Sequence, residues 1–366
     1  MADERDGLAR AIVLHDRAMA CRREHRLDEA AAFAAEAVTA LGGATDGGNL
    51  DTATILNNLA WVYEARAEFG RAEELARMAL ASLADSGDDA DARDVRVRVL
   101  TNLGWLCRCQ SRYPEAETLL REARRLAKRL GAEQEAIVLN TLAVLYKYTG
   151  RFDEARRMYL RALRILEAAH GPAHPDVATI YHNLGGLEHA RRRFARGEPY
   201  ARRAVEIRTA ALGPDHPDVA ADKANLAAQL DGQGKLDEAE ALYHEALAVF
   251  ERVYGPEHYE IAVNCNNLAA IHDARGRHDE AEALYRRALA IKEKLLGPDH
   301  RDVAVTLNNL GVLLKRRARY AEAEPVLARA LALFEAALGP DHLDVVACRE
   351  NLEGLRAASG QEGADR

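Results

Sequence analysis

The chain has 366 residues, of which 48% are hydrophobic and 30% are charged, and its formal net charge is −8 at pH 7. This composition is enough for a buried core and a solvated surface, and the sequence contains no apolar run of about 18 residues that could cross a membrane. The net negative charge argues against a general affinity for nucleic acid.

The N-terminal sequence and the cysteines predict the compartment. The first residues, MADERDG, are acidic where a secretory signal would be basic and then apolar, which predicts that the protein is not exported. The five cysteines are an odd number and lie inside helical patterns, which argues against a disulfide framework. Together these features predict a cytoplasmic protein.

The sequence repeats with a period of 42 residues over its second half. Loop tetrads of the form G-P-x-H begin at Gly171, Gly213, Gly255, Gly297 and Gly339. A fixed period of this length is typical of repeat architectures, in which each unit packs against its neighbours. We therefore interpret residues 1–366 as one elongated array and not as two or three globular domains.

Two amphipathic helical patterns alternate within each unit, so that each unit is predicted to be a helical hairpin. In one unit, Leu236, Ala239, Tyr243, Leu247 and Phe250 follow steps of three and four residues. The hairpins are predicted at about 4–41, 50–84, 94–130, 133–170, 175–212, 217–254, 259–296 and 301–338. A capping helix is predicted at 344–358, followed by a frayed tail at 359–366.

The loop tetrads carry the signals that end one helix and begin the next. Gly213 can adopt the left-handed conformation that ends a helix, and Pro214 prevents the helix from continuing. Asp215 or His216 can then cap the next helix. The links at 41–51 and 85–94 lack the tetrad, and we expect flexibility or a change of superhelical pitch there.

Small residues occupy three fixed places in every unit, with spacings of 12 and then 7 residues. Helix axes that approach to about 8–10 Å need small side chains at the contact, so these places predict the crossing points of each hairpin. Two examples of the series are Gly104, Ala116 and Ala123, and Ala227, Ala239 and Ala246.

This spacing of small residues resembles the tetratricopeptide repeat, although the usual repeat is shorter, at about 34 residues. The 42-residue period, the loop L-G-P-D-H-P-D-V-A and the helical N-N-L-A are similar to the repeats of kinesin light chain and its bacterial relatives, over residues 4–358. The resemblance implies an all-α, right-handed superhelical solenoid. Because no heptad region precedes the first hairpin, we do not expect motor association to carry over.

An asparagine precedes the repeated leucine in most units, as Asn58, Asn102, Asn183, Asn225, Asn267, Asn309 and Asn351, whereas the fourth unit has Asn140 followed by Thr141. Asparagine inside a helix costs up to about 0.7 kcal/mol relative to alanine, so these placements need a compensating gain. One candidate gain is a structural hydrogen bond to the neighbouring hairpin. The other is a ladder of amides that binds the backbone of an extended peptide.

The resemblance implies that this position faces a concave groove and contacts peptide ligands. The candidate groove residues are Asn58, Asn102, Asn140, Asn183, Asn225, Asn267, Asn309, Arg108, Lys147, His182, His189 and Lys315. The central charges are positive and those at Asp231 and Asp273 are negative, which predicts a peptide of acidic and then basic character. A solvated mixed face is the alternative explanation of these charges.

Catalytic and metal-binding motifs are missing from the sequence. It contains no Gly-rich phosphate loop, H-E-x-x-H or G-x-S-x-G, and we predict neither an enzyme nor a cofactor. The histidines of the loops lie one to a hairpin and cannot converge on a zinc ion, so no metal site is predicted. These histidines are His174, His216, His258, His300 and His342.

The sequence contains two further clusters, a pair of cysteines and a group of arginines. Cys107 and Cys109 lie on different faces of a helix, and we interpret them as one packing residue and one groove thiol. Seven arginines between 191 and 208 are a candidate surface for an acidic partner or nucleic acid, although a solvated face is the favoured explanation. They are Arg191, Arg192, Arg193, Arg196, Arg202, Arg203 and Arg208.

The sequence thus favours a protein-interaction scaffold or adaptor that binds an extended peptide of a partner. The main alternative is a regulatory partner of a separate effector that responds to a peptide or small molecule. An enzyme in a helical scaffold is the third class, and it would require a pocket in which a group such as Lys147 or His189 has a strongly perturbed pKa. The identity of the partner is not encoded in any motif.

Overall fold

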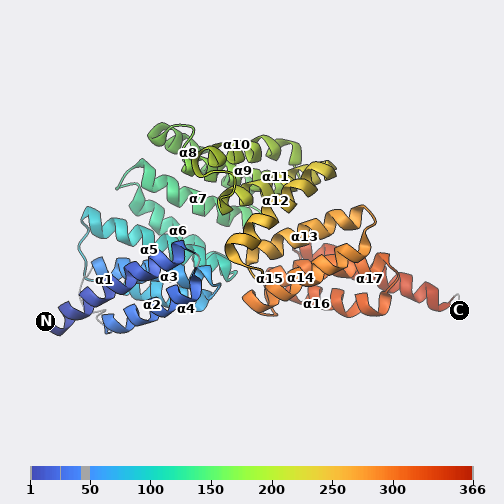
Figure 1. Cartoon of the computed structure of the whole chain (residues 1–366), viewed down its shortest axis with the longest axis horizontal. Helices are drawn as coiled ribbons and strands as arrows, with labels where there is room; N and C mark the ends of the chain where they lie inside the picture. The colour runs from blue at the N-terminus through green and yellow to red at the C-terminus, as the bar shows by residue number, and fades with distance from the viewer. Residues whose placement is uncertain (1, 25, 43–49, 365–366) are drawn as a thin grey trace. The chain divides into compact units, whose positions relative to one another are not determined.

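The structure is a computed structural model that describes residues 2–24, 26–42 and 50–364. These residues form seventeen α-helices and, among themselves, no strand (Figure 1). The predicted all-α class, with eight hairpins and a final single helix, is therefore confirmed. The right-handed superhelical path of the whole array stays a prediction.

The chain divides into two compact units, residues 1–211 and 212–366. The first unit contains the hairpins α1/α2, α3/α4, α5/α6, α7/α8 and α9/α10. The bounds of its helices are Ala2–Arg23, Leu27–Leu41, Leu50–Ala65, Phe69–Ala81, Ala90–Cys109, Tyr113–Ala127, Ala132–Tyr148, Phe152–His170, Pro175–Ala190 and Phe194–Leu212. Within this unit the first helices of successive hairpins contact one another, from α1 through α9.

The second unit contains the hairpins α11/α12, α13/α14 and α15/α16 and the single helix α17. Their bounds are Pro217–Asp231, Leu236–Tyr254, Tyr259–Ala274, His278–Leu296, Arg301–Arg316, Tyr320–Leu338 and Leu343–Ala364. Here too the first helices α11, α13, α15 and α17 contact one another in succession. The helix α17 continues through the predicted tail as far as Ala364, whereas residues 365–366, and residues 43–49 of the first link, lie outside the described part.

The loop tetrads end and restart the helices as the sequence predicts. Gly213 and Gly255 have φ of 84° and 76°, in the region that only glycine adopts without strain. The sequence left open whether Asp215 or His216 caps the next helix, and the structure selects the histidine. The Nδ1 atom of His216 accepts the backbone N–H of Asp218 at 3.1 Å, and the other four loop histidines make the same contact two residues on.

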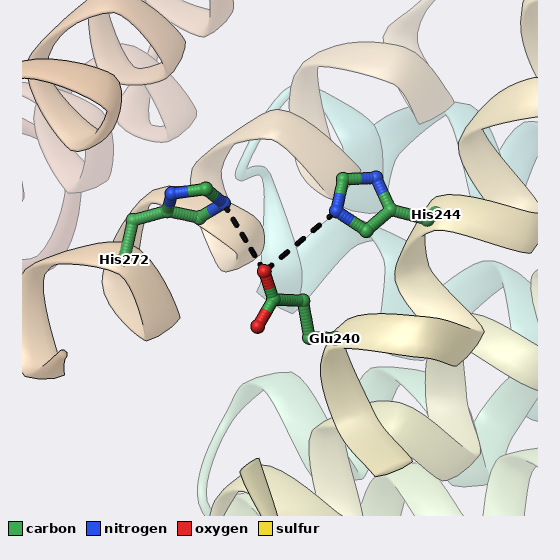
Figure 2. A group of neighbouring side chains, drawn as sticks. All are labelled: Glu240, His244 and His272. Atoms are coloured by element: carbon green, nitrogen blue, oxygen red, sulfur yellow. Dashed lines mark ion pairs between the residues drawn. The ribbon is translucent and has the colours of Figure 1, made fainter. Parts of the chain in front are cut away.

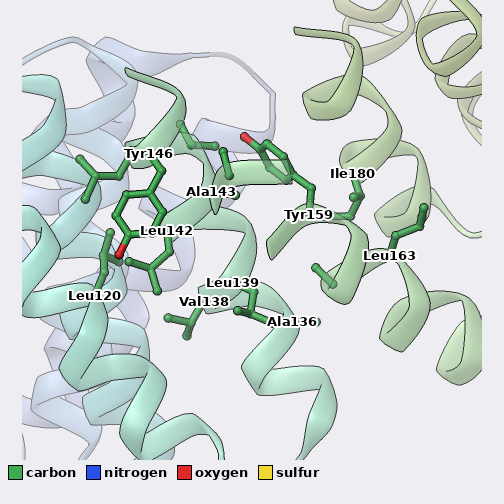
Figure 3. Packing of buried hydrophobic residues seen from close by; sticks show 14 of the residues in the cluster. Leu120, Ala136, Val138, Leu139, Leu142, Ala143, Tyr146, Tyr159, Leu163 and Ile180 are labelled. Atoms are coloured by element: carbon green, nitrogen blue, oxygen red, sulfur yellow. The ribbon is translucent and has the colours of Figure 1, made fainter. Parts of the chain in front are cut away.

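The core follows the small residues that the sequence placed at the helix crossings. In the third and fourth hairpins Ala116, Ala123, Ala155 and Ala162 are fully buried. Larger side chains such as Tyr146 and Leu139 belong to the same buried cluster, and Figure 3 shows them among its other members. The small positions therefore let two helices approach, and the leucines and tyrosines around them supply most of the buried apolar area.

Two of the crossing positions are glycines with no room for a side chain. A methyl group on Gly104 would lie 2.5 Å from Cγ of Leu120, and one on Gly311 would lie 2.6 Å from Cγ of Leu327. Both leucines are fully buried, so neither can swing away into solvent. The α5/α6 and α15/α16 crossings consequently depend on glycine, although glycine lowers helix stability elsewhere.

We expect Gly104→Ala to destabilise the protein by about 1–3 kcal/mol, because the overpacked contact outweighs the gain in helix propensity. Gly70→Ala is the matched control, because Gly70 lies in α4 with nothing within 4 Å of its added methyl group. We expect this control to stabilise the protein by about 0.5–1 kcal/mol. Midpoints of chemical denaturation would test both, and equal stabilisation by the two substitutions would contradict the close contact.

Candidate functional site

The repeated asparagines form hydrogen bonds between the first helices of neighbouring hairpins. In each observed pair the asparagine before the repeated leucine donates its Nδ2–H to Oδ1 of the residue one place earlier in the preceding repeat. The pairs are Asn102 to Asn57 at 3.1 Å, Asn183 to Asn140 at 2.8 Å, Asn309 to Asn266 at 3.3 Å and Asn351 to Asn308 at 3.0 Å. We call these four contacts the amide rungs.

The amide rungs make the structural hydrogen bond that was one of the two explanations for the asparagines. Asn57 and Asn102 are 2% and 7% exposed, so their rung is buried, whereas Asn140, Asn183 and Asn309 are half-buried. Each amide has two donor hydrogens and two acceptor lone pairs, and a rung uses only one of these on each side. The half-buried amides therefore keep capacity for a second hydrogen bond.

The remaining asparagines of the series make different contacts. The Nδ2 atom of Asn58 lies 3.2 Å from Nε2 of His15 on α1. Asn225 accepts from Gln229 in its own helix at 3.2 Å, and Asn267 accepts from its neighbour Asn266 at 3.4 Å. His15 stands at the position that Asn57 has in the next repeat, so Asn58 makes the contact of an amide rung with a histidine as its partner.

The second helices are fastened to one another by ion pairs instead of amides. An arginine that precedes one second helix reaches a glutamate of the second helix before it. The pairs are Arg112 with Glu73, Arg151 with Glu117, Arg277 with Glu240 and Arg319 with Glu282. The guanidinium groups of Arg112 and then Arg77 are the main reason that the pKa of Glu73 is lowered to about 2.

Two cations of the first unit are not paired in this way. The guanidinium carbon of Arg108 lies 4.0 Å from the ring centre of Trp105 and 4.7 Å from that of Tyr148, and Nζ of Lys147 lies 5.3 Å from the Tyr148 ring. Neither cation forms an ion pair with a carboxylate of the described residues. We call these four residues, from α5 and α7, the cation–aromatic patch.

The electrostatics of the cation–aromatic patch combine burial with the charges of neighbouring groups. Burial, and then repulsion from Arg108, lowers the pKa of Lys147 from 10.5 to about 8. Burial raises the pKa of Glu64, while a hydrogen bond from Trp105 and the charges of Arg108 and Arg22 oppose that rise. A second negative group placed beside Arg108 and Lys147 would therefore be stabilised.

The two predicted histidines lie on α9. The ring of His189 packs edge-on against Phe194 with centroids 5.2 Å apart. The pKa of His189 is lowered, first because the surrounding chain desolvates the ring and then because Lys147 and Arg192 repel a proton. His182 is half-buried one place before Asn183. The electrostatic coupling of His189 to Lys147 links α9 to the cation–aromatic patch.

Predicted groove residues of the second unit form hydrogen bonds and ion pairs within the chain. Lys315 donates from Nζ to the backbone carbonyl of Asn351 at 3.4 Å. Asp273 forms ion pairs with Arg316 and with His278, and burial raises the pKa of Asp231. Acidic groups are thus present here as predicted, but the charge of Asp273 is already balanced.

Some residues of the cysteine pair and of the arginine cluster at 191–208 have structural roles. Cys107 is fully buried, and burial raises the pKa of its thiol, whereas Cys109 is half-buried. Of the seven arginines between 191 and 208, several are bound within the chain. Those contacts are Arg191 with Asp153, Arg202 with Glu198, Arg203 with Glu206 and Arg208 with Thr179.

Sequence reasoning missed Tyr148, although a signal for it was present. Tyr148 stands seven places after Thr141, where the other units have small or polar residues. Those residues are Ala65, Cys109, Ala190, Gly232, Ala274 and Arg316. A single aromatic residue at a repeat position that is otherwise not aromatic marks a place where one unit differs from the array.

Comparison with known proteins identifies the family. The tetratricopeptide repeat model matches residues 6–85, 134–196, 221–294, 266–336 and 302–363, and a second tetratricopeptide repeat model matches residues 96–130 and 177–218. These matches cover most of the chain. The protein is thus a helical repeat protein of the class that serves as interaction scaffolds, and it belongs to the tetratricopeptide repeat family.

One curated relative with a similar sequence is a kinesin light chain-related protein. The Arabidopsis thaliana protein Kinesin Light Chain-Related 1 is 27% identical over 143 residues, which are 39% of this chain and 23% of that protein. This chain therefore matches only about a quarter of that relative. The matched part is similar in sequence to that kinesin light chain-related protein, in agreement with the resemblance seen in the repeat pattern.

Solved structures share the fold. The crystal structure of a Rap protein complexed with competence and sporulation factor has a TM-score of 0.60 at 16% identity, over 85% of this chain and 89% of that chain. A putative kinesin light chain from Podosopora anserina, with nearly identical TPR-like repeats, is 22% identical over 54% of this chain and 93% of its own, with a TM-score of 0.43. No described helix is long and apolar enough to cross a bilayer.

We expect Asn102→Ala to lower the free energy of unfolding by about 1–3 kcal/mol, because it leaves the buried Oδ1 of Asn57 without its donor. The double variant Asn57→Ala with Asn102→Ala should cost less than the sum of the two single variants, since both partners are then removed. Chemical denaturation of the four proteins gives this coupling energy. Strictly additive losses would contradict a rung that contributes to stability.

We expect Lys147 to lose its proton near pH 8, and this should be visible in the carbon shifts of its labelled side chain. Because the pKa is lower in the folded chain than in the unfolded chain, the unfolded chain binds more protons between pH 8 and 10.5, and stability rises with pH in that window relative to Lys147→Gln. Arg108→Gln should raise the pKa by removing a repelling charge. A titration midpoint near 10.5 in the wild-type protein would contradict the assignment.

Proposed function

We propose that the protein is an interaction scaffold that binds an extended, acidic segment of a partner protein on the first helices α5, α7 and α9. The family supports the coarser part of this statement, since tetratricopeptide repeat arrays serve as protein-interaction scaffolds and are generally not enzymes. The finer part, the location and the acidic character of the bound segment, depends on the residues of the first unit.

The observation that carries the proposal is that Arg108 and Lys147 lie close together and neither forms an ion pair with a carboxylate of the described residues. Elsewhere in the chain arginines of successive repeats pair with glutamates, as Arg112 does with Glu73. Holding two positive groups together, half-buried and with no ion-paired carboxylate among the described residues, costs free energy in the unbound protein. A carboxylate from a partner would reduce the repulsion between the two cations, and this gain would add to its binding free energy.

The aromatic side chains add a reason for binding an extended segment. The rings of Trp105 and Tyr148 contact the cations and offer apolar surface beside them. A ligand that alternates acidic and apolar side chains would therefore fit both the cations and the rings. The half-buried amides of Asn140 and Asn183 lie on the adjacent first helices and keep hydrogen-bonding capacity for a peptide backbone. In this proposal the rungs stay closed and bind with their second donor or acceptor.

The test uses short fluorescein-labelled peptides in which acidic and apolar residues alternate, with glutamine-substituted copies as the neutral form. Anisotropy titrations of the full-length chain should show binding of the acidic peptide that weakens as salt is added. Removing both cations in Arg108→Gln with Lys147→Gln should weaken it by about tenfold or more, since hydrogen bonds to charged groups contribute about 1.5–3 kcal/mol each.

The matched control is Arg125→Gln, which removes an exposed cation of α6 whose partner is Glu122 at 3.9 Å. This variant should bind the acidic peptide as the wild-type protein does. Circular dichroism melting would show that all variants are folded. Equal binding of acidic and neutral peptides, or the same loss in the α6 control, would overturn the proposed site.

A further inference from the structure

Three side chains with metal-binding atoms meet between α12 and α13 in the second unit. They are Glu240 and His244, one turn apart on α12, and His272 near the end of α13, and we call them the histidine cluster. Their carboxylate and imidazole atoms all lie within 4.8 Å of one another. Figure 2 shows the two imidazoles on opposite sides of the Glu240 carboxylate, each with a ring nitrogen toward the same oxygen.

His272 has a nitrogen atom that the protein leaves without a hydrogen bond. The residue is only 8% exposed, and its Nδ1 atom lies 3.1 Å from Oε2 of Glu280. In the neutral ring that contact places the proton on Nδ1, and the other nitrogen, Nε2, then has a lone pair for a metal ion. This Nε2 is buried, forms no hydrogen bond among the described residues and faces Oε1 of Glu240 at 3.7 Å.

The neighbouring repeats serve as internal references for these positions. At the place of His272 they have Leu230 and Leu314, which are almost fully buried. At the place of His244 they have Arg202 and Arg286, each paired with the glutamate one turn earlier. This joint has therefore replaced a core leucine and a paired arginine with two histidines that share one carboxylate.

We propose that Glu240, His244 and His272 bind a Zn²⁺ ion. Two imidazoles and one carboxylate are a known zinc ligand set, and with three protein ligands a fourth position stays open for water. In a tetrahedral site with bonds of about 2.0–2.1 Å the ligand atoms are about 3.3–3.5 Å apart. Oε1 of Glu240 lies 3.8 and 3.7 Å from Nε2 of His244 and of His272, and the three ligand atoms lie within 4.8 Å of one another, so the side chains would move closer together around the ion.

Glu280 would support the zinc ion from outside the ligand set. A histidine that binds a metal usually donates its other N–H to a carboxylate, which fixes the ring and makes it a better ligand. His272 already has this arrangement through Glu280. The buried Nε2 atom, which forms no hydrogen bond among the described residues, and the ring oriented by Glu280 are two separate features that favour a zinc ligand.

Two arginines compete with the metal ion for Glu240. Nη2 of Arg277 lies 2.7 Å from Oε1 and Nη1 of Arg275 lies 2.9 Å from Oε2. Arg275 also pairs with Asp237, and Nε of Arg277 lies 3.8 Å from Glu280, so both have another carboxylate when Oε1 turns to the metal. Three carboxylates against two guanidinium groups leave a net negative charge for a divalent cation to balance.

Zinc binding would fasten two hairpins together. Glu240 and His244 belong to the second helix of the sixth hairpin, and His272 belongs to the first helix of the seventh. The contact between α12 and α13 would then be held by metal bonds in addition to packing. Occupancy of the site would therefore stiffen this joint of the second unit.

The test uses the full-length chain without a polyhistidine tag, titrated with Zn²⁺ in competition with a chromophoric chelator. We expect one tightly held equivalent of zinc and a rise in melting temperature. Co²⁺ should give the visible absorption of a four-coordinate site and should be displaced by Zn²⁺. Failure of the wild-type protein to compete with the chelator would overturn the proposal.

Two of the variants introduce the residues that neighbouring repeats have at the same positions, so we expect these variants to fold. His272→Leu and His244→Arg should each abolish the tight equivalent, and the metal-free His272→Leu protein should melt no lower than the wild type. Glu280→Gln should weaken zinc binding by about tenfold or more through the orientation of His272. Arg277→Gln should strengthen binding, because it removes the competing cation from Oε1.

His278→Ala is the matched control, since His278 lies on the next helix and contacts Asp273 instead of the cluster. It should leave zinc binding unchanged. Tight zinc binding that survives His272→Leu and His244→Arg, or that is lost equally in the control, would overturn the site.

Discussion

The close crossing of two helices at side chains with almost no volume is the constraint on which this structure depends. Ala116, Ala123 and their counterparts are fully buried, and Gly104 and Gly311 leave no room even for a methyl group beside the leucines that face them. A short distance between helices brings many backbone and side-chain atoms into contact, and it fixes how the next hairpin can pack. The small residues thus set the geometry in which all other side chains of a unit must find partners.

Given that geometry, the chain uses two kinds of contact to hold neighbouring hairpins in register. The first helices are joined by neutral amide pairs such as Asn183 with Asn140, and the second helices by charged pairs such as Arg319 with Glu282. A half-buried amide costs less to desolvate than an ion, and it keeps a spare donor and acceptor. The first helices are consequently stabilised without using up their capacity to bind a partner.

The proposed binding residues lie at positions that depart from this pattern of contacts between repeats. Arg108 and Lys147 form no ion pair with a carboxylate of the described residues, and they lie against aromatic rings instead. His244 and His272 stand where neighbouring repeats have arginine and leucine. In an array the other copies show what packing alone requires, so a departure in one copy is a sign of an additional role.

Much of the fold follows from the sequence, because helix ends and crossings are local features. The glycine–proline tetrads give the hairpin boundaries, and the spacing of small residues gives the crossings. The choice of His216 over Asp215 as the cap could not be predicted, because both side chains can accept the same N–H.

The candidate sites were less predictable because they depend on distances between repeats. The sequence identified the asparagines and both cations, but it left open whether the asparagines form structural hydrogen bonds or a ladder that binds a peptide. His244 and His272 are 28 residues apart, and they meet only because α12 packs against α13. No motif records that register, although the replacement of Leu230 and Leu314 by a histidine could have drawn attention to it.

A crystal structure of the chain with a bound acidic segment tests the central claim most directly. The account predicts carboxylates of that segment within hydrogen-bonding distance of Arg108 and Lys147, with the rungs of Asn102 and Asn183 still closed. A segment bound along the second helices, or one that opens the amide rungs to take their place, would contradict it.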